Sequence, residues 1–224
     1  MSDSDSFIDE VTEEVRRDHL YGLLRRYGWI AVLAIVLIVG GAAFNEYRKS
    51  QRAASAQQLG DQVLAAMRSN GAEARAAELS SITADSAGGN AVIDFMLAAA
   101  QVEAGQIPAA VAALDSIATN GDLPEIYRQI ASFKALTLQT DSLSAAERRL
   151  QFEALAQPGA PLRLLAQEQL ALIDVAEGDT QAAIDRLQAI LQDAESSGDL
   201  QQRAQQVIVA LGGTPEPRSF EQQG

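Results

Sequence analysis

The longest apolar stretch of the chain runs from residue 28 to residue 44 (GWIAVLAIVLIVGGAAF) and contains no charged side chain. As a helix that rises 1.5 Å per residue, it would span roughly 26 Å, near the lower limit for crossing a bilayer. Aromatic and basic residues flank it at both ends, as they do around membrane-spanning helices. We therefore predict a single N-terminal transmembrane helix over residues 27–44. Its predicted interface residues are Arg25, Arg26, Tyr27, Trp29, Phe44, Tyr47, Arg48 and Lys49.

Two other interpretations of this apolar stretch stay open. It could be a buried helix of a soluble domain, although such helices rarely carry aromatic and basic residues at both ends. It could also be a signal peptide that is cleaved, although the segment before it is long and many of its residues are acidic. An uncleaved membrane anchor is the interpretation that we favour.

The segment before the apolar stretch, residues 1–26, is predicted to form an amphipathic arm. Apolar residues such as Val11 and Val15 fall near one face of a helix, and most of the other positions are charged. The arm is either a solvated extension of the anchor or a docking helix for a partner. It contains the only histidine of the chain, His19, which we expect to lie at the surface. Four arginines precede the anchor and three basic residues follow it, which favours a cytoplasmic N-terminus and a periplasmic C-terminal part.

Residues 45–211 show helical periodicity that repeats, with no sustained alternation of the kind that strands require. A glycine followed five residues later by an alanine recurs along this region. The intervals between these motifs correspond to a period of 34–37 residues, which is typical of solenoids built from helix pairs. Each glycine is expected to end one helix, and each small residue lets the next helix approach closely. The predicted turn and packing positions are Gly71, Ala76, Gly105, Ala110, Ala146, Gly178 and Ala183, with Asp141 in place of the third glycine.

The pattern therefore predicts an all-α protein in which the anchor precedes a solenoid of about four helix pairs and a capping helix. Ser144 with Glu147 and Asp122 with Glu125 have the spacing of capping boxes, and Pro124 is expected in a first helical turn. A final helix is predicted to begin at Asp199 and to run through residue 211. The polar, proline-containing segment 212–224 is predicted to be a disordered tail.

The composition excludes most chemistry. The net charge is −13, which argues against a nucleic-acid partner because phosphate binding needs clustered Lys and Arg. The chain has no cysteine, so thiol catalysis and thiolate metal sites are excluded. Acidic residues are expected on outer faces or at helix starts, and Arg128, Arg148 and Arg149 are expected to form surface ion pairs. We predict no enzymatic activity, no cofactor, no metal and no small-molecule substrate.

What remains is the recognition of other proteins. A curved stack of helix pairs presents a groove that can hold an extended or helical segment. The first helices of the pairs are expected to line this groove. The polar candidates on them are Asp94, Gln101, Gln129 and Gln167.

Two segments, LAAAQVEAGQIPAAVAALDSI (97–117) and LALIDVAEGDTQAAIDRLQAI (170–190), resemble tetratricopeptide repeats. The whole layout resembles the YfgM-type family of membrane-anchored tetratricopeptide-like proteins, most specifically over residues 9–29 (DEVTEEVRRDHLYGLLRRYGW). This resemblance implies a single-pass protein of the bacterial inner membrane with its repeats in the periplasm. It also implies an ancillary role at the SecYEG translocon, near periplasmic chaperones. The alternative is a tetratricopeptide scaffold for another envelope process, such as cell division or outer-membrane assembly.

Overall fold

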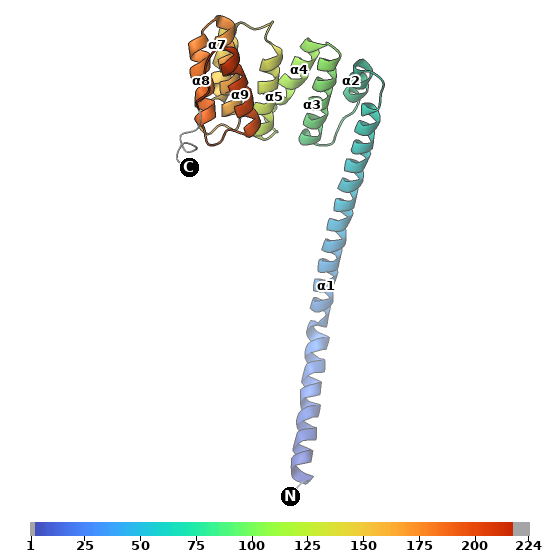
Figure 1. The fold of residues 1–224 in the computed structure, drawn as a ribbon. Helices are drawn as coiled ribbons and strands as arrows, with labels where there is room; N and C mark the ends of the chain where they lie inside the picture. The colour runs from blue at the N-terminus through green and yellow to red at the C-terminus, as the bar shows by residue number, and fades with distance from the viewer. Residues whose placement is uncertain (1–2, 217–224) are drawn as a thin grey trace. The chain divides into compact units, whose positions relative to one another are not determined.

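The computed structural model describes residues 3–216, with the side chains of residues 3–24, 27, 28, 31 and 32 left out (Figure 1). Every regular element in this range is a helix, which confirms the predicted all-α class. By its internal contacts the chain divides into two units, residues 1–60 and residues 61–224. The helices are α1 (Asp3–Met67), α2 (Ala72–Ser80), α3 (Ala87–Glu103), α4 (Ile107–Ala118), α5 (Glu125–Leu138), α6 (Ala145–Leu155), α7 (Arg163–Glu177), α8 (Thr180–Gln192) and α9 (Gly198–Ala210).

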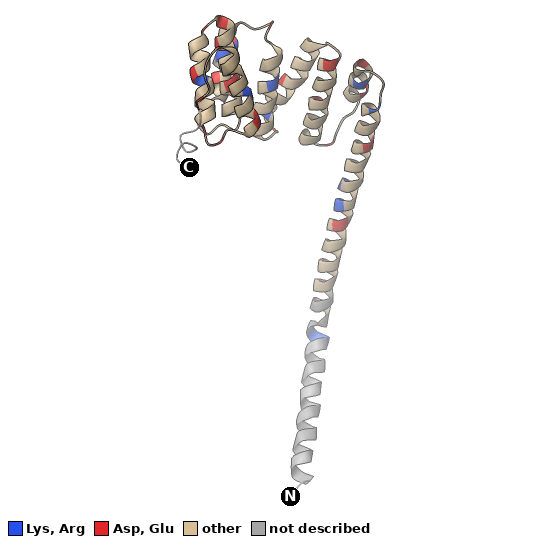
Figure 2. Cartoon of the chain, viewed as in Figure 1, with Lys and Arg blue, Asp and Glu red and all other residues tan. Residues whose placement is uncertain are grey.

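The first unit consists of α1 up to Gly60. Large apolar side chains follow one another on all sides of this helix and are exposed, among them Leu37 (67%) and Ile38 (71%). Figure 2 shows that the stretch that carries them has no charged residue.

In the described part of the chain, no helix combines the length and the hydropathy that a membrane span requires. The transmembrane helix predicted over residues 27–44 is therefore not supported by the structure. The side chains of Tyr27, Gly28, Ala31 and Val32 lie outside the described residues. The predicted amphipathic face of the arm also lies outside them, because side chains are described there only for Arg25 and Arg26.

The second unit is a stack of helix pairs. The last turns of α1 pack with α2, where Ala66 is buried together with Ala76 and Leu79. The pairs α3–α4, α5–α6 and α7–α8 follow, and α9 packs against α8 at the end of the stack (Figure 1). The described residues of this unit therefore form the predicted four pairs and one capping helix.

The glycines at the predicted turns have positive φ angles, a backbone conformation that L side chains rarely adopt. Gly105 (φ 72°) lies between α3 and α4, and Gly71 (φ 99°) lies just before α2. Gly178 (φ 83°, ψ 6°) ends α7 in the left-handed conformation. These glycines let the chain reverse within a few residues, so that the two helices of a pair begin in contact.

Small residues lie where the paired helices approach one another. Ala98 of α3 and Ala110 of α4 are buried, and so are Ala171 of α7 and Ala183 of α8. Four and seven residues after Ala110 and Ala183, large apolar side chains fill the space beside the next helix pair. These four side chains, Leu114, Ile117, Leu187 and Ile190, are all buried.

The α5–α6 pair departs from this pattern. Ala146 is exposed, so the prediction that it packs like Ala110 and Ala183 is wrong. The equivalent position is that of Arg148, which lies four residues before the buried Phe152, as Ala183 lies four residues before Leu187. Arg148 is too large for a close approach, which fits the six-residue connection from 139 to 144 between α5 and α6. No residue of this connection has a positive φ angle, so Asp141 does not act as the glycines do.

One of the two predicted capping boxes is confirmed. The Ser144 hydroxyl accepts a hydrogen bond from the Glu147 N–H (3.2 Å), and the Glu147 carboxylate accepts one from the Ser144 N–H (3.0 Å). The box at Asp122 is wrong, because α5 begins at Glu125 and the residue before it, Pro124, has an extended conformation (ψ 143°). Pro124 therefore stands outside the first turn, and Asp122 is too far from the helix to cap it.

The last helix begins earlier than predicted. Ser197 caps α9 with its hydroxyl, which accepts a hydrogen bond from the Leu200 N–H (3.4 Å), so Asp199 lies inside the first turn. The prediction of a disordered tail is wrong for residues 212–216, because hydrogen bonds hold them against α8 and α9. The rest of the predicted tail, residues 217–224, lies outside the described residues.

Candidate interaction surface

A row of mostly apolar residues lies at equivalent positions of α3, α5 and α7, the first helices of three successive pairs. Its two members on α3 and the second one on α7 are exposed, and the other three are half-buried. On each helix two members of the row are seven residues apart, which places them two turns apart on one side. Val92 on α3 and Leu172 on α7 are 51% and 41% exposed. The row, named the A-helix stripe below, consists of Val92, Ala99, Ile130, Thr137, Leu165 and Leu172.

The stripe occupies equivalent positions in each repeat. Each member directly precedes a residue that packs against the previous helix pair, as Val92 precedes the buried Ile93 and Ile130 precedes the buried Ala131. Because repeats of one period stack with a nearly constant rotation, equivalent side chains face the same side of the stack. The exposed members of the stripe on α3 and α7 are apolar, as on surfaces that bind a segment of another protein, whereas the half-buried Leu165 also packs against the core.

The polar residues predicted to line a groove do not belong to this stripe. Asp94 on α3 is half-buried, and this partial burial raises the pKa of its carboxyl group. The side-chain Oε1 of Gln101 is buried without a hydrogen-bond partner. Gln129 on α5 donates a hydrogen bond to Glu125 (2.8 Å), and its Oε1 is also buried without a partner. Asp94, Gln101 and Gln129 are therefore partly buried, and their role in a groove stays a prediction.

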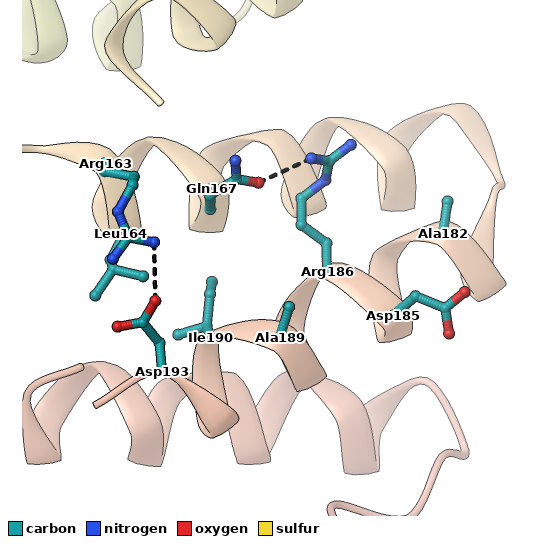
Figure 3. A pocket seen from close by; sticks show the side chains of 9 residues that line it. All are labelled: Arg163, Leu164, Gln167, Ala182, Asp185, Arg186, Ala189, Ile190 and Asp193. Carbon is teal, nitrogen blue, oxygen red and sulfur yellow. Dashed lines mark hydrogen bonds and ion pairs between the residues drawn. The ribbon is translucent and has the colours of Figure 1, made fainter. Parts of the chain in front are cut away.

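Gln167 lines a cavity of about 390 Å³ between α7 and α8. Figure 3 shows its side chain pointing toward Arg186 of α8, from which it accepts a hydrogen bond of 2.8 Å. At one end of the same cavity, Arg163 pairs with Asp193 at 2.8 Å. Both arginines of the cavity are therefore engaged by side chains of the chain itself.

The best-buried carboxylate in this part of the molecule belongs to Asp174, which is 3% exposed. Its two oxygens pair with arginines from two different helices, Arg149 of α6 (2.7 Å) and Arg186 of α8 (3.0 Å). Arg149 also pairs with Glu177 at 2.5 Å, and these hydrogen bonds to Asp174 and Glu177 raise its pKa. Asp174 thus joins α6, α7 and α8 through charge-assisted bonds that replace the water it lost on burial.

A second carboxylate of α7 joins this helix to α9. Glu168 is buried and accepts two hydrogen bonds from Arg203, at 2.7 and 2.9 Å. The bonds to Glu168 raise the pKa of Arg203, and bonds to Asp193 and Glu195 raise the pKa of Arg163. The two-pronged geometry matches the fork of the guanidinium group to the carboxylate.

These pairs correct the expectation that acidic residues lie only on outer faces or at helix starts. The sequence carries one signal that we missed. Asp174 directly follows the buried Ile173, and Glu168 lies three residues before the buried Ala171, so both fall on the apolar side of α7, where a charge must find a partner. Arg149 does form the predicted ion pairs, although its main partner is buried. Among the residues with described side chains, no cluster of His, Asp or Glu could hold a metal ion.

The predicted membrane-interface residues lie in α1. Trp29, Phe44 and Tyr47 are each more than 60% exposed. The Arg48 guanidinium lies 5.8 Å from the centre of the Phe44 ring, a cation–π contact. Also exposed are Arg25, Arg26, Arg48 and Lys49, while the side chain of Tyr27 lies outside the described residues.

Comparison with known families matches residues 24–142 to the tetratricopeptide repeat-like domain. The match covers more than half of the chain, so the protein belongs to this family. Its fold is that of a protein-interaction module, consistent with the stacked helix pairs. No curated protein and no solved structure matches the chain.

Proposed function

We propose that the protein is a membrane-anchored interaction module that binds segments of other proteins along the A-helix stripe. The observation that carries this proposal is the exposure of apolar side chains on the same side of two repeats, Val92 on α3 and Leu172 on α7. An apolar strip that is not covered by the chain itself is stabilised when a partner removes it from water. The acidic character of the chain favours partners with basic or apolar segments.

We further propose that residues 27–44 cross a membrane once. Exposed Leu, Ile and Val side chains on all sides of α1 support this proposal, because each of them is more stable in lipid than in water. The family match begins at residue 24 and so includes the apolar stretch. The basic residues on the N-terminal side favour a cytoplasmic N-terminus, which places the repeats in the periplasm.

The topology can be tested with a reporter enzyme that is active only outside the cytoplasm. Fused after Gly224, the reporter is expected to be active, and fused at the N-terminus it is expected to be inactive. The opposite result would place the repeats in the cytoplasm. Recovery of the chain without membranes would refute the anchor itself.

Protein export is the process that we propose for the module, with the SecYEG translocon and periplasmic chaperones as partners. This part rests on the family resemblance of residues 9–29 and of the overall layout. The alternative is a scaffold for cell division or outer-membrane assembly.

Purification of the full chain in mild detergent, followed by identification of bound proteins, separates these two functions. Recovery of the translocon supports the export role, and recovery of division or assembly proteins instead would refute it. The double variant Val92→Asp/Leu172→Asp is expected to lose at least tenfold of the bound partner. Leu150→Asp is the matched control, because Leu150 is an exposed leucine of α6 outside the stripe. Equal loss in the control would refute the stripe as the binding surface.

A further inference from the structure

The chain turns back on itself directly after α9. Gly212 has a positive φ angle (80°), and the Gly213 N–H donates a hydrogen bond to the Ile208 carbonyl (2.9 Å). A Cβ on Gly213 would lie 3.0 Å from side-chain carbons of both Ile184 and Ile208. A side chain at this position would force these neighbours to shift by a few tenths of an ångström, so a glycine suits the close approach of the backbone to α8 and α9.

Beyond this turn, the tail is held by an amide side chain of α8. The Gln188 side chain donates to the Glu216 carbonyl (3.0 Å) and accepts from the Glu216 N–H (3.0 Å). Gln192, one turn later on α8, donates to the same carbonyl at 3.4 Å. Gln188 thus satisfies both main-chain groups of a single residue, as a neighbouring strand would.

The surface that makes these contacts differs from the cavity between α7 and α8. Ile184, Gln188 and Gln192 follow one another at four-residue spacing and so share one face of α8. None of the three lines the cavity. The apolar Ile184 lies against the glycine turn. The two amides meet the main chain that follows, where prolines at positions 215 and 217 favour an extended conformation of the residue before each of them.

Between α8 and Glu216, the three hydrogen bonds of the described residues all involve the main chain of Glu216 and none involves its side chain. Such a contact recognises an extended backbone with a free N–H, whatever the side chain at that position. It selects against helices, whose N–H and carbonyl groups are already bonded within the helix.

We propose that this face of α8 is a second binding surface, which takes an extended segment of a partner protein through Gln188 and Gln192. The chain's own tail occupies the surface in cis and is displaced by the partner. The tail is suited to this role because its hydrogen bonds to α8 are exposed, so water can replace them. The proposal is independent of the export role and of the A-helix stripe.

A short tether keeps the tail at a high effective concentration, in the millimolar range for flexible linkers. A peptide added in trans must therefore compete poorly with the intact tail and bind well when the tail is missing. A chain that ends after Gly213 keeps every described helix and the Gly213–Ile208 hydrogen bond.

The test uses a fluorescently labelled peptide with the sequence of residues 212–224 and measures its binding by anisotropy. We expect the chain ending after Gly213 to bind this peptide at least tenfold more tightly than the full chain does. In the shortened chain, Gln188→Ala is expected to weaken binding at least tenfold. Gln181→Ala is the matched control, because Gln181 is exposed on α8 and its side chain, among the described residues, hydrogen-bonds to Asp185 and not to Glu216. Equal binding by the Gln188→Ala and Gln181→Ala variants would refute the proposal.

Peptide variants test whether the α8 surface recognises the main chain of the peptide rather than its side chains. Replacement of Glu216 by Pro in the peptide removes the N–H that donates a hydrogen bond to Gln188, and this peptide is expected not to bind. The Glu216→Ala peptide keeps this N–H and is expected to bind within about twofold of the original. A third peptide with shuffled side chains, but with its glycines and prolines in place, is expected to bind within about threefold. If the shuffled peptide fails while the original binds, the surface serves the tail alone and the partner proposal is overturned.

In the full chain, hydrogen exchange gives a second readout. The Glu216 amide is expected to exchange at least tenfold more slowly than the same amide in the free peptide. This protection should disappear in Gln188→Ala and persist in Gln181→Ala. An unprotected Glu216 amide in the unaltered chain would show that the tail is not bound, and would overturn the proposal.

Discussion

The pairs α3–α4 and α7–α8 have small and apolar buried residues at equivalent positions, where their two helices meet. They differ in the residues at certain other equivalent positions. The equivalent buried residues of the two pairs are 73 positions apart, as Ala110 and Ala183 are. At the same spacing, Gln101 corresponds to Asp174, and Ala113 corresponds to Arg186. Where α7–α8 has a buried ion pair, α3–α4 has a glutamine oxygen without a partner and an alanine packed on the core.

This difference shows that the geometry of the helix pair does not depend on whether these other positions carry an ion pair, an amide or an alanine. Both pairs place their helices in contact, because both keep small residues at the close approach and a glycine at the turn. The C-terminal pair adds a network that joins three helices through Asp174. Charges in such a network must all be paired, since a single unpaired member would be buried without compensation.

The largest effect is expected from the removal of Asp174. Asp174→Leu leaves Arg149 and Arg186 without their shared partner, so it should lower the free energy of unfolding by about 3 kcal/mol, the lower end for broken buried pairs. The arginines are about a quarter exposed, which limits the loss. Urea unfolding of the full chain, followed by circular dichroism, measures this change.

The matched variant in the other pair is Gln101→Met. It removes an oxygen that has no partner, so we expect the stability to change by less than about 1 kcal/mol, or to rise. Comparable losses in the two variants would mean that the two pairs do not differ as described. Hydrogen exchange should show that Asp174→Leu loosens α6–α8 before α3–α4.

An intermediate effect is expected where the helices approach closely. Ala110→Leu forces a large side chain into a filled space and should cost about 2 kcal/mol. Ala146→Leu, in the divergent α5–α6 pair, should change the stability by less than about 0.5 kcal/mol because Ala146 is exposed. The same urea unfolding measurement compares the two variants. A large loss of stability in Ala146→Leu would show that Ala146 packs closely, as Ala110 and Ala183 do.

The smallest effect concerns Asp94, whose pKa is raised by partial burial. Because the folded state favours the neutral acid, the stability is highest below the ordinary pKa of 3.8 and falls as the pH rises through the folded pKa. Asp94→Asn should therefore be more stable than the original chain at pH 7, by less than about 0.5 kcal/mol. The gain should vanish at pH 3 when urea unfolding is repeated there, and a gain of equal size at both pH values would contradict a role for the charge.

Much of the fold could be predicted because it depends on contacts between residues close in sequence. Gly105, Gly178 and the alanines that follow them specify a turn and a close approach within one helix pair. The Ser144–Glu147 capping box is equally local. The prediction failed at Ala146 because sequence spacing was extended across a connection of different length. It failed at Asp122 because Pro124 keeps the chain extended up to the start of α5.

The candidate surfaces could be predicted less well. The apolar A-helix stripe was missed because its members look like core residues in the sequence, and only their burial shows which side of each helix is covered. The partners of Asp174 lie 25 residues before it and 12 residues after it, on helices whose rotation the sequence leaves open.

The sequence by itself determined the helix pairs, their period and their turns, because helical periodicity, glycine turns and capping act over a few residues. Only the tertiary structure decided which polar groups are buried together and where the tail binds. Those contacts join Arg149 to Asp174 and Gln188 to Glu216 across different elements. They depend on the relative rotation of packed helices, which follows from the fit of many side chains at once.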